Sequence, residues 1–75
     1  MLLSLAPPGV PLIIDFIEEM DLSQRKQLSN LGIIQDSEVE IVTRDRAGVI
    51  LMVKGSRIGI AKDMAKMIRV SIKSG

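Results

Sequence analysis

The sequence predicts a mainly β protein: one small five-stranded barrel, with an α-helix between strands one and two and a short helical turn before the last strand. The chain has 75 residues. A domain of this size buries only about 60% of its unfolded surface, so its apolar residues must share one core. Cysteine and histidine are both absent, which excludes disulfides and the usual zinc fingers. Hydrophobic residues make up 47% of the chain and aromatic residues 1%, so the core must be aliphatic. We expect a single domain over residues 1–75.

The first strand is expected over Leu12–Glu18. The segment "PLIIDFIEE" is rich in β-branched residues, which favour strands. The preceding "PPGV" is typical of a turn. Pro11 is tolerated because the first residue of a strand need not donate a hydrogen bond.

One helix is expected between Asp21 and Gly32. Asp21 can cap its N-terminus, with Gln24 three residues later forming a pair that resembles a capping box. Leu28 and Leu31 share one face of this helix. Gly32 ends it, because a left-handed residue is needed there.

The remaining elements are four strands and one helical turn. In "SEVEIVTRD" apolar and polar residues alternate, which places Val39, Ile41 and Thr43 on one face and Glu38, Glu40 and Arg44 on the other. The nearly all-apolar "VILMV" is expected to be covered on both faces. The expected strands are 37–45, 49–53, 57–61 and 68–73, and the helical turn is 62–67.

Glycines and apolar alternation complete the prediction. Gly55 is free to take a positive φ in the "KGS" turn. Gly59, inside a strand, indicates a bulge or a close backbone approach. In the last strand Ile68, Val70 and Ile72 are expected to point inward. Closing the sheet into a barrel would remove exposed strand edges.

Two segments, "NLGIIQDSEVEIV" and "ILMVKGSRIGIAKDMAKMIRV", resemble the FeoA family of small proteins associated with ferrous iron transport. The likeness covers nearly the whole chain and implies an SH3-like barrel, which also forms the C-terminal domain of iron- and manganese-dependent repressors. No helix-turn-helix precedes the barrel, so a free-standing FeoA protein is the better match. Asp36 stands where the family usually has glycine, and aspartate tolerates left-handed geometry. The matching positions are Leu31, Gly32, Ile33, Val39, Ile41, Val53, Gly55, Gly59, Ile60, Ala65, Ile68 and Val70.

The resemblance implies a non-enzymatic accessory protein of ferrous iron uptake. It would dock on the cytoplasmic GTP-binding part of the FeoB membrane transporter. The alternative is a stand-alone regulatory module that responds to a transition metal, related to the repressor domains. The oligomeric state and the docking surface stay open. The uncharged segment 1–14 lacks a basic start and is too short to cross a bilayer. We therefore expect a cytoplasmic protein that does not insert into the membrane.

No metal site is predicted. Ferrous iron favours imidazole and carboxylate ligands, and imidazole is absent. The related repressor domains are implied to hold ancillary ligands near the corresponding helix start, but a capping pair explains Asp21 and Gln24. Met52, Met64 and Met67 fit apolar patterns and are interpreted as core fillers. The carboxylates before the helix are interpreted as a solvated strand end and a helix cap: Asp15, Glu18, Glu19 and Asp21.

Catalysis, cofactor binding and nucleic-acid binding are not predicted either. The chain has no histidine base and no cysteine nucleophile. Phe16 alone cannot build the aromatic groove with which SH3 domains bind proline-rich peptides. A net charge of +1 gives little attraction for nucleic acid. The basic residues at the hairpin ends are interpreted as a solvated rim: Arg44, Arg46, Lys54 and Arg57. Protein contact remains, with an apolar helix patch as one candidate surface: Gln27, Leu28 and Leu31.

Overall fold

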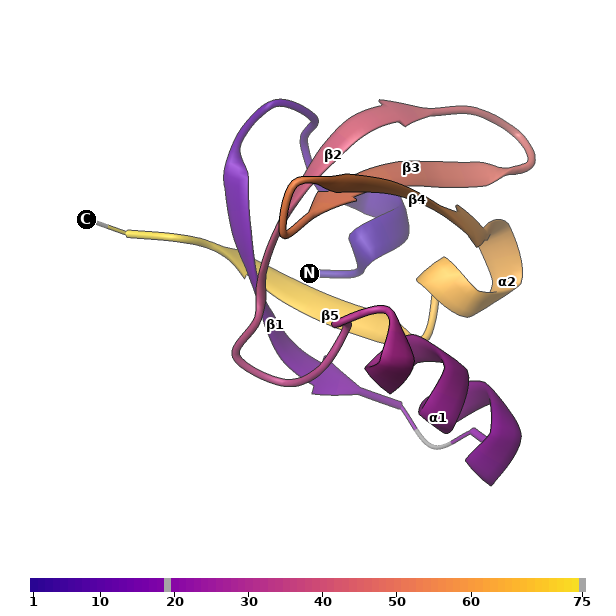
Figure 1. The fold of residues 1–75 in the computed structure, drawn as a ribbon. Helices are drawn as coiled ribbons and strands as arrows, with labels where there is room; N and C mark the ends of the chain where they lie inside the picture. Colours follow the sequence, from indigo (N-terminus) through magenta and orange to yellow (C-terminus); the bar gives the residue numbers. More distant parts are fainter. Residues whose placement is uncertain (19, 75) are drawn as a thin grey trace.

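The computed structural model describes residues 1–18 and 20–74 and confirms the predicted fold class (Figure 1). Five antiparallel strands form one bent sheet in the order β4-β3-β2-β1-β5. None of the helices in the described part of the chain has the length and hydrophobicity that a membrane crossing requires. A short 3₁₀ helix at the start, η1, was not predicted. In chain order the elements are η1 (Leu3–Leu5), β1 (Pro11–Ile17), α1 (Leu22–Asn30), β2 (Glu38–Arg44), β3 (Gly48–Val53), β4 (Ser56–Ala61), α2 (Lys62–Ala65) and β5 (Ile68–Ile72).

The helix and turn signals that were identified in the sequence are confirmed. The Asp21 side chain caps α1 by accepting a hydrogen bond from the backbone N–H of Gln24. Gly32, just after the helix, has a φ of 86°. Asp36 takes a φ of 73°, which confirms that aspartate replaces glycine in this left-handed turn.

The sheet closes only in part. On its outer side β5 pairs with the N-terminal segment, where the amide of Val70 donates to the carbonyl of Met1 at 2.7 Å. Among the described residues β4 pairs with β3 alone, so it remains an edge strand. Figure 1 shows α1 below β4, on the side where α2 joins β4 to β5. The expectation that closure removes the edges is therefore correct for β5 and wrong for β4.

The core is aliphatic, as predicted, and no polar or charged side chain of the described residues is buried in it. Every strand contributes to it, and so do η1, α2 and the loop after α1. From α1 itself only Leu28 is buried. The buried residues are Leu3, Ala6, Leu12, Ile14, Leu28, Ile33, Val39, Ile41, Val49, Leu51, Val53, Ile60, Ala65, Ile68 and Val70.

Two expectations about burial were wrong. Ile72 is 52% exposed because it is the last residue of β5, where the core ends. Ile50 is 40% exposed, so β3 is covered on one face only.

The irregular positions of the sheet also differ from expectation. Gly59 pairs regularly with Ile50, and no atom lies within 4 Å of the place where its Cβ would be. The register shifts instead in β1 after Ile14 and in β2 after Ile41. The shift in β2 turns Thr43 to the outside, although alternation had placed it with the buried residues of that strand.

Candidate functional site

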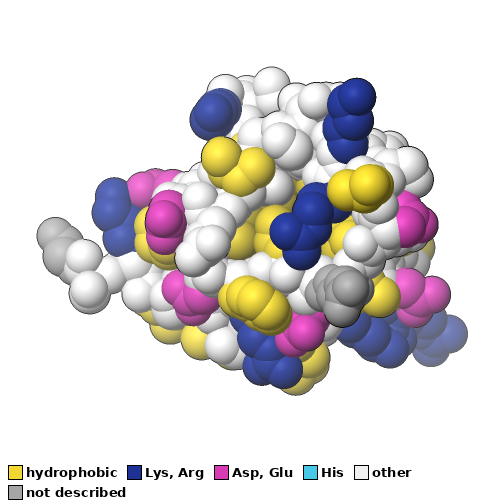
Figure 2. All heavy atoms as spheres, turned by 90° about the horizontal axis from the view of Figure 1, so that it is seen from below, with side chains coloured by type: hydrophobic (Ala, Val, Ile, Leu, Met, Phe, Trp, Pro, Cys, Tyr) yellow, Lys and Arg dark blue, Asp and Glu magenta, His cyan; other side chains and the backbone are white. Residues whose placement is uncertain are grey.

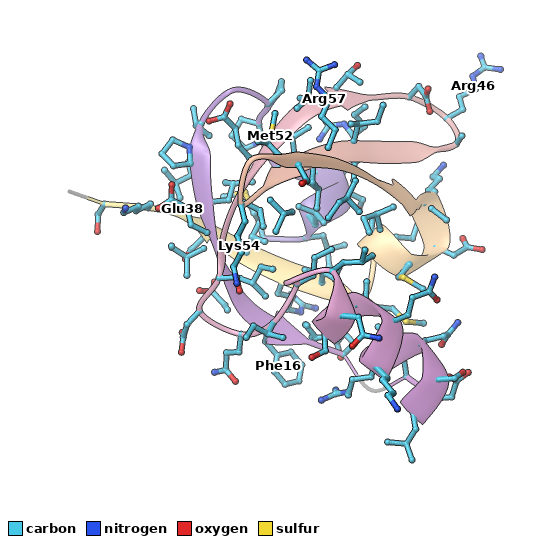
Figure 3. The ribbon with its side chains drawn as sticks, in the orientation of Figure 1. Phe16, Glu38, Arg46, Met52, Lys54 and Arg57 are labelled. Carbon is cyan, nitrogen blue, oxygen red and sulfur yellow. The ribbon has the colours of Figure 1, made fainter. Side chains whose placement is uncertain are left out.

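An apolar crevice lies where the end of β1 meets α1 and the loop that follows the helix. Its volume is about 320 Å³. In Figure 3 Phe16 lies on the lower side of the molecule, beside α1. Figure 2 shows this side with apolar side chains spread over it and basic and acidic ones between them. The crevice is lined by Phe16, Ile17, Arg25, Ser29, Ile33, Ile34 and Gln35.

The bulge in β1 is the reason that Phe16 faces outward. In a regular strand side chains alternate, so Phe16 would follow Leu12 and Ile14 into the core. The register shifts between Ile14 and Phe16, which leaves Asp15 unpaired between them. Bulges commonly re-aim a side chain in this way. As a result the only aromatic residue of the chain is 51% exposed.

The opposite wall comes from two consecutive isoleucines after the helix. The amide of Ile33 donates to the carbonyl of Leu28 at 2.9 Å, and this turn buries the Ile33 side chain to 1% exposure. The next side chain then points away from the core, so Ile34 is 46% exposed. The amide of Asp36 donates to the carbonyl of Ile14 at 2.7 Å and ties this loop to β1. The crevice is therefore held by backbone hydrogen bonds on both sides.

Arg25 provides the charge at the crevice. One of its terminal nitrogens, Nη2, donates to the carbonyl of Ile17 at 3.2 Å, which attaches the side chain to the end of β1. A guanidinium has five N–H donors and stays protonated in proteins. Among the described residues the ion pairs are Glu18 with Arg69 and Glu38 with Lys73, so Arg25 has no carboxylate partner there.

The carboxylates that precede α1 are engaged separately. The Ser71 hydroxyl donates to Asp15 at 2.9 Å, and Arg69 donates to Glu18 at 2.9 Å. Asp21 accepts hydrogen bonds from the amide of Gln24 at 2.8 Å and from the hydroxyl of Ser23 at 2.7 Å. These bonds, the one from Gln24 first, lower the pKa of Asp21 from its ordinary value of 3.8. Glu19 lies outside the described residues.

Within residues 1–18 and 20–74 no three acidic side chains come close enough together to hold a metal ion.

The methionines divide between the core and the surface. Met52 and Met64 are half-buried, and Met64 packs against the core as predicted. Met67 is 37% exposed, so its interpretation as a core filler was wrong. It follows α2 in the turn that leads to β5, where the core covers only part of the side chain.

The basic residues of the hairpins gather only in part, since Arg44 and Arg46 line one pocket of about 430 Å³ together with Asp45 and Lys62, and Lys54 and Arg57 do not. Arg44 donates to the carbonyl of Ala6 and is tied to the segment after η1. Figure 3 places Arg46 at the β2–β3 turn and Lys54 at the β3–β4 turn, which lie at opposite ends of β3. Arg57 projects from β4, on the outer side of the sheet. All four residues are exposed, which agrees with their interpretation as a solvated rim.

Two of the three residues of the predicted helix patch lie at the surface. Leu28 is buried, Leu31 is 39% exposed, and Gln27 is exposed. Phe16 and Ile34 were not recognised as surface candidates from the sequence. The bulge that exposes Phe16 leaves no signal in the pattern, whereas the pair Ile33–Ile34 directly after a helix stop could have indicated one outward side chain.

The chain matches one protein family and several solved structures. A model of the FeoA domain matches residues 1–72. No curated protein sequence matches the chain. The solved structure of iron(II) transport protein A from Clostridium thermocellum is 27% identical, with a TM-score of 0.86 over 96% of this chain and 45% of that one. This chain thus spans less than half of that protein.

Two further FeoA structures match along most of their length. An iron uptake regulatory protein (FeoA) is 25% identical, with a TM-score of 0.82 over 93% of both chains. FeoA from Stenotrophomonas maltophilia, an SH3 domain protein complexed with zinc, is 20% identical, with a TM-score of 0.79 over 95% of this chain and 89% of that one. ScaR with bound zinc shares the fold at 19% identity, with a TM-score of 0.84 over 97% of this chain and 37% of that one. The chain therefore belongs to the FeoA family, which is linked to ferrous iron transport, and it has the SH3-like fold of that family.

Proposed function

We propose that this chain is a non-enzymatic accessory protein of ferrous iron uptake that docks on the cytoplasmic GTP-binding part of the FeoB transporter. The observation that carries the proposal is the crevice between β1 and α1, where the large apolar side chains of Phe16 and Ile34 are about half exposed. Exposed apolar side chains beside polar ones are typical of protein interfaces. The FeoA of Stenotrophomonas maltophilia has been suggested to act as a ferrous iron transport activating factor, which supports the same role.

The groups at the crevice suit binding better than reaction. Four of its seven lining residues are apolar, and its one charged group is the guanidinium of Arg25, which can donate hydrogen bonds. Ser29 and Gln35 add hydrogen-bonding groups at the rim. Such a surface can hold a partner in one orientation and so influence the partner's own chemistry.

The test is direct binding between this protein and the purified cytoplasmic domain of FeoB, measured by calorimetry at low and moderate salt. Docking predicts saturable binding with one site per chain. An interface of the usual transient size gives a Kd of roughly micromolar order. No association at tens of micromolar protein under both salt conditions would contradict the proposal.

A metal-responsive regulatory module is the second candidate, favoured by the fold shared with the zinc-bound repressor ScaR. Anaerobic calorimetry with ferrous iron or manganese separates the two functions. A stoichiometric site of micromolar affinity would favour metal sensing, and its absence would favour an interaction module.

A further inference from the structure

We infer that the crevice between β1 and α1 binds a partner segment that places an apolar side chain next to a carboxylate. This inference rests on the proposed function, because it identifies the chemistry by which the FeoB cytoplasmic part would be recognised. The crevice offers such a segment exposed hydrocarbon and a guanidinium.

Two local backbone features expose the apolar side chains at the crevice. A bulge in β1 turns Phe16 out of the core, and the loop after α1 buries Ile33 while exposing Ile34. Burying a phenylalanine side chain stabilises a folded protein or a complex, and folding leaves about half of the Phe16 side chain available for this. The two exposed side chains flank a volume of about 320 Å³, enough for one or two side chains of a partner.

The charge at the crevice is positive, and no carboxylate of residues 1–18 or 20–74 forms an ion pair with it. Arg25 is attached to the carbonyl of Ile17 through Nη2, so its remaining donors are held at the apolar surface without a carboxylate partner among the described residues. The nearby Glu18 is already paired with Arg69. Asp21 caps the start of α1. Asp36 follows Gln35 in the chain but does not line the crevice.

A second positive charge lies near the loop that follows α1. The helix itself places no negative charge beside Arg25, since no acidic residue occurs between Leu22 and Asn30. The Lys54 side chain lies over Gly32, since its Cδ and Cε would be 3.7 Å from a Cβ at that position. Figure 3 shows Lys54 directed toward this loop. Charge complementarity therefore favours an acidic segment, and Arg25 can hold a carboxylate with two parallel hydrogen bonds.

The binding experiment compares charge and apolar variants with matched controls against the FeoB cytoplasmic domain. Arg25→Glu reverses the crevice charge, and Lys26→Glu makes the same change on the adjacent residue, which does not line the crevice. Phe16→Ala removes the apolar wall, and Ile50→Ala removes a similarly exposed side chain from β3. We expect Arg25→Glu and Phe16→Ala each to raise the Kd by at least about tenfold, and the controls by less than about threefold.

Arg25→Glu also removes the hydrogen bond to Ile17, so folding is checked separately. A dispersed amide NMR spectrum shows that each variant is folded. Arg25→Lys keeps the charge but loses the planar fork, and we expect it to bind with an intermediate Kd. If the wild-type protein binds FeoB and Arg25→Glu and Phe16→Ala change the Kd as little as the two controls do, docking stands and the crevice is the wrong surface.

A second probe tests the crevice even if the FeoB domain does not bind at all. The probe is a capped tetrapeptide of alternating leucine and glutamate, with a glutamine version as the control. Titration of the former at millimolar concentration should move the amide signals of Phe16, Arg25 and Ile34, and the latter should move them much less. Equal shifts with both peptides would overturn the inference. Shifts confined to residues away from the crevice would overturn it as well.

Discussion

Gly48 in β3 faces the backbone carbonyl of Ile60 in β4 so closely that a methyl group on Gly48 would collide with the carbonyl oxygen. The amide nitrogen of Lys62 is the next obstacle, at 3.0 Å from the same methyl position. Both obstacles are backbone atoms, which cannot rotate away as a flexible side chain would. The contact lies at the start of the β3–β4 ladder, directly before the chain enters α2.

Gly48→Ala is therefore expected to lower the free energy of unfolding by roughly 2–4 kcal/mol, because the ladder must shift to accept the methyl group. The measurement is urea denaturation followed by circular dichroism. Gly59→Ala is the control in the next strand, since its methyl group would meet nothing within 4 Å. Gly59→Ala should change the free energy by less than about 1 kcal/mol, because alanine also has less backbone freedom in the unfolded chain. Equal losses of unfolding free energy in the two variants would contradict the predicted collision at Gly48.

Leu28 and Leu31 give the second prediction, because the structure separates two leucines that share a helix face. Leu28 is 1% exposed and is the only buried residue of α1, whereas Leu31 is 39% exposed. Leu28→Ala should lower the free energy of unfolding by about 2–5 kcal/mol, and Leu31→Ala by less than about 1.5 kcal/mol. Denaturant titration of the two variants side by side checks the difference. Similar losses would mean that α1 is anchored by both residues.

The fold was predictable from the sequence because its determinants are local. Alternation placed Val39 and Ile41 in the core, Asp21 marked the helix start, and Gly32 marked its end. Each of these signals depends on neighbours within a few residues, and a tertiary contact did not override any of them.

The crevice was less predictable because it depends on a bulge. A bulge inserts one residue into a strand and reverses alternation beyond it, while the sequence on either side still reads as a regular strand. In a regular strand Phe16 would be the next inward residue after Ile14. Residue type was no better guide to the bulges. The glycine at position 59 suggested an irregularity there, but Gly59 pairs regularly and the register shifts lie at Asp15 and Val42.

Asp36 gives the third prediction, because its φ of 73° is a conformation that side chains rarely adopt. Asp36→Gly should leave the free energy of unfolding unchanged or raise it slightly, since glycine takes this conformation without strain. Asp36→Val should lower it by about 1–2 kcal/mol, because a β-branched side chain fits left-handed geometry poorly. The control is Gln35→Val, at an exposed neighbouring position with negative φ. If Asp36→Gly were as destabilising as Asp36→Val, the carboxylate itself would be the stabilising feature.

Asp21 gives the fourth prediction, which concerns pH. Hydrogen bonds from the amide of Gln24 and the hydroxyl of Ser23 favour the charged carboxylate and lower its pKa in the folded protein. Because the folded pKa is below the unfolded one, this stabilisation is fully present above the ordinary pKa of 3.8 and is lost as the pH falls through the folded value. Asp21→Asn keeps a capping oxygen without the charge. As the pH is lowered from about 5 through the acid range in which aspartate titrates, the melting temperature of the wild type should therefore fall relative to that of Asp21→Asn.

The pKa of Asp21 can also be measured directly, by NMR titration of its carboxyl carbon. The wild-type pKa should lie below 3.8. Ser23→Ala should raise it part of the way back, because the hydroxyl that donates at 2.7 Å is removed while the larger contribution from the Gln24 amide remains. Ser29→Ala, which changes a serine of α1 away from the cap, should leave the pKa of Asp21 as it is. A wild-type pKa at or above 3.8 would show that the cap does not prefer the charged form, and the predicted pH dependence of stability would then disappear as well.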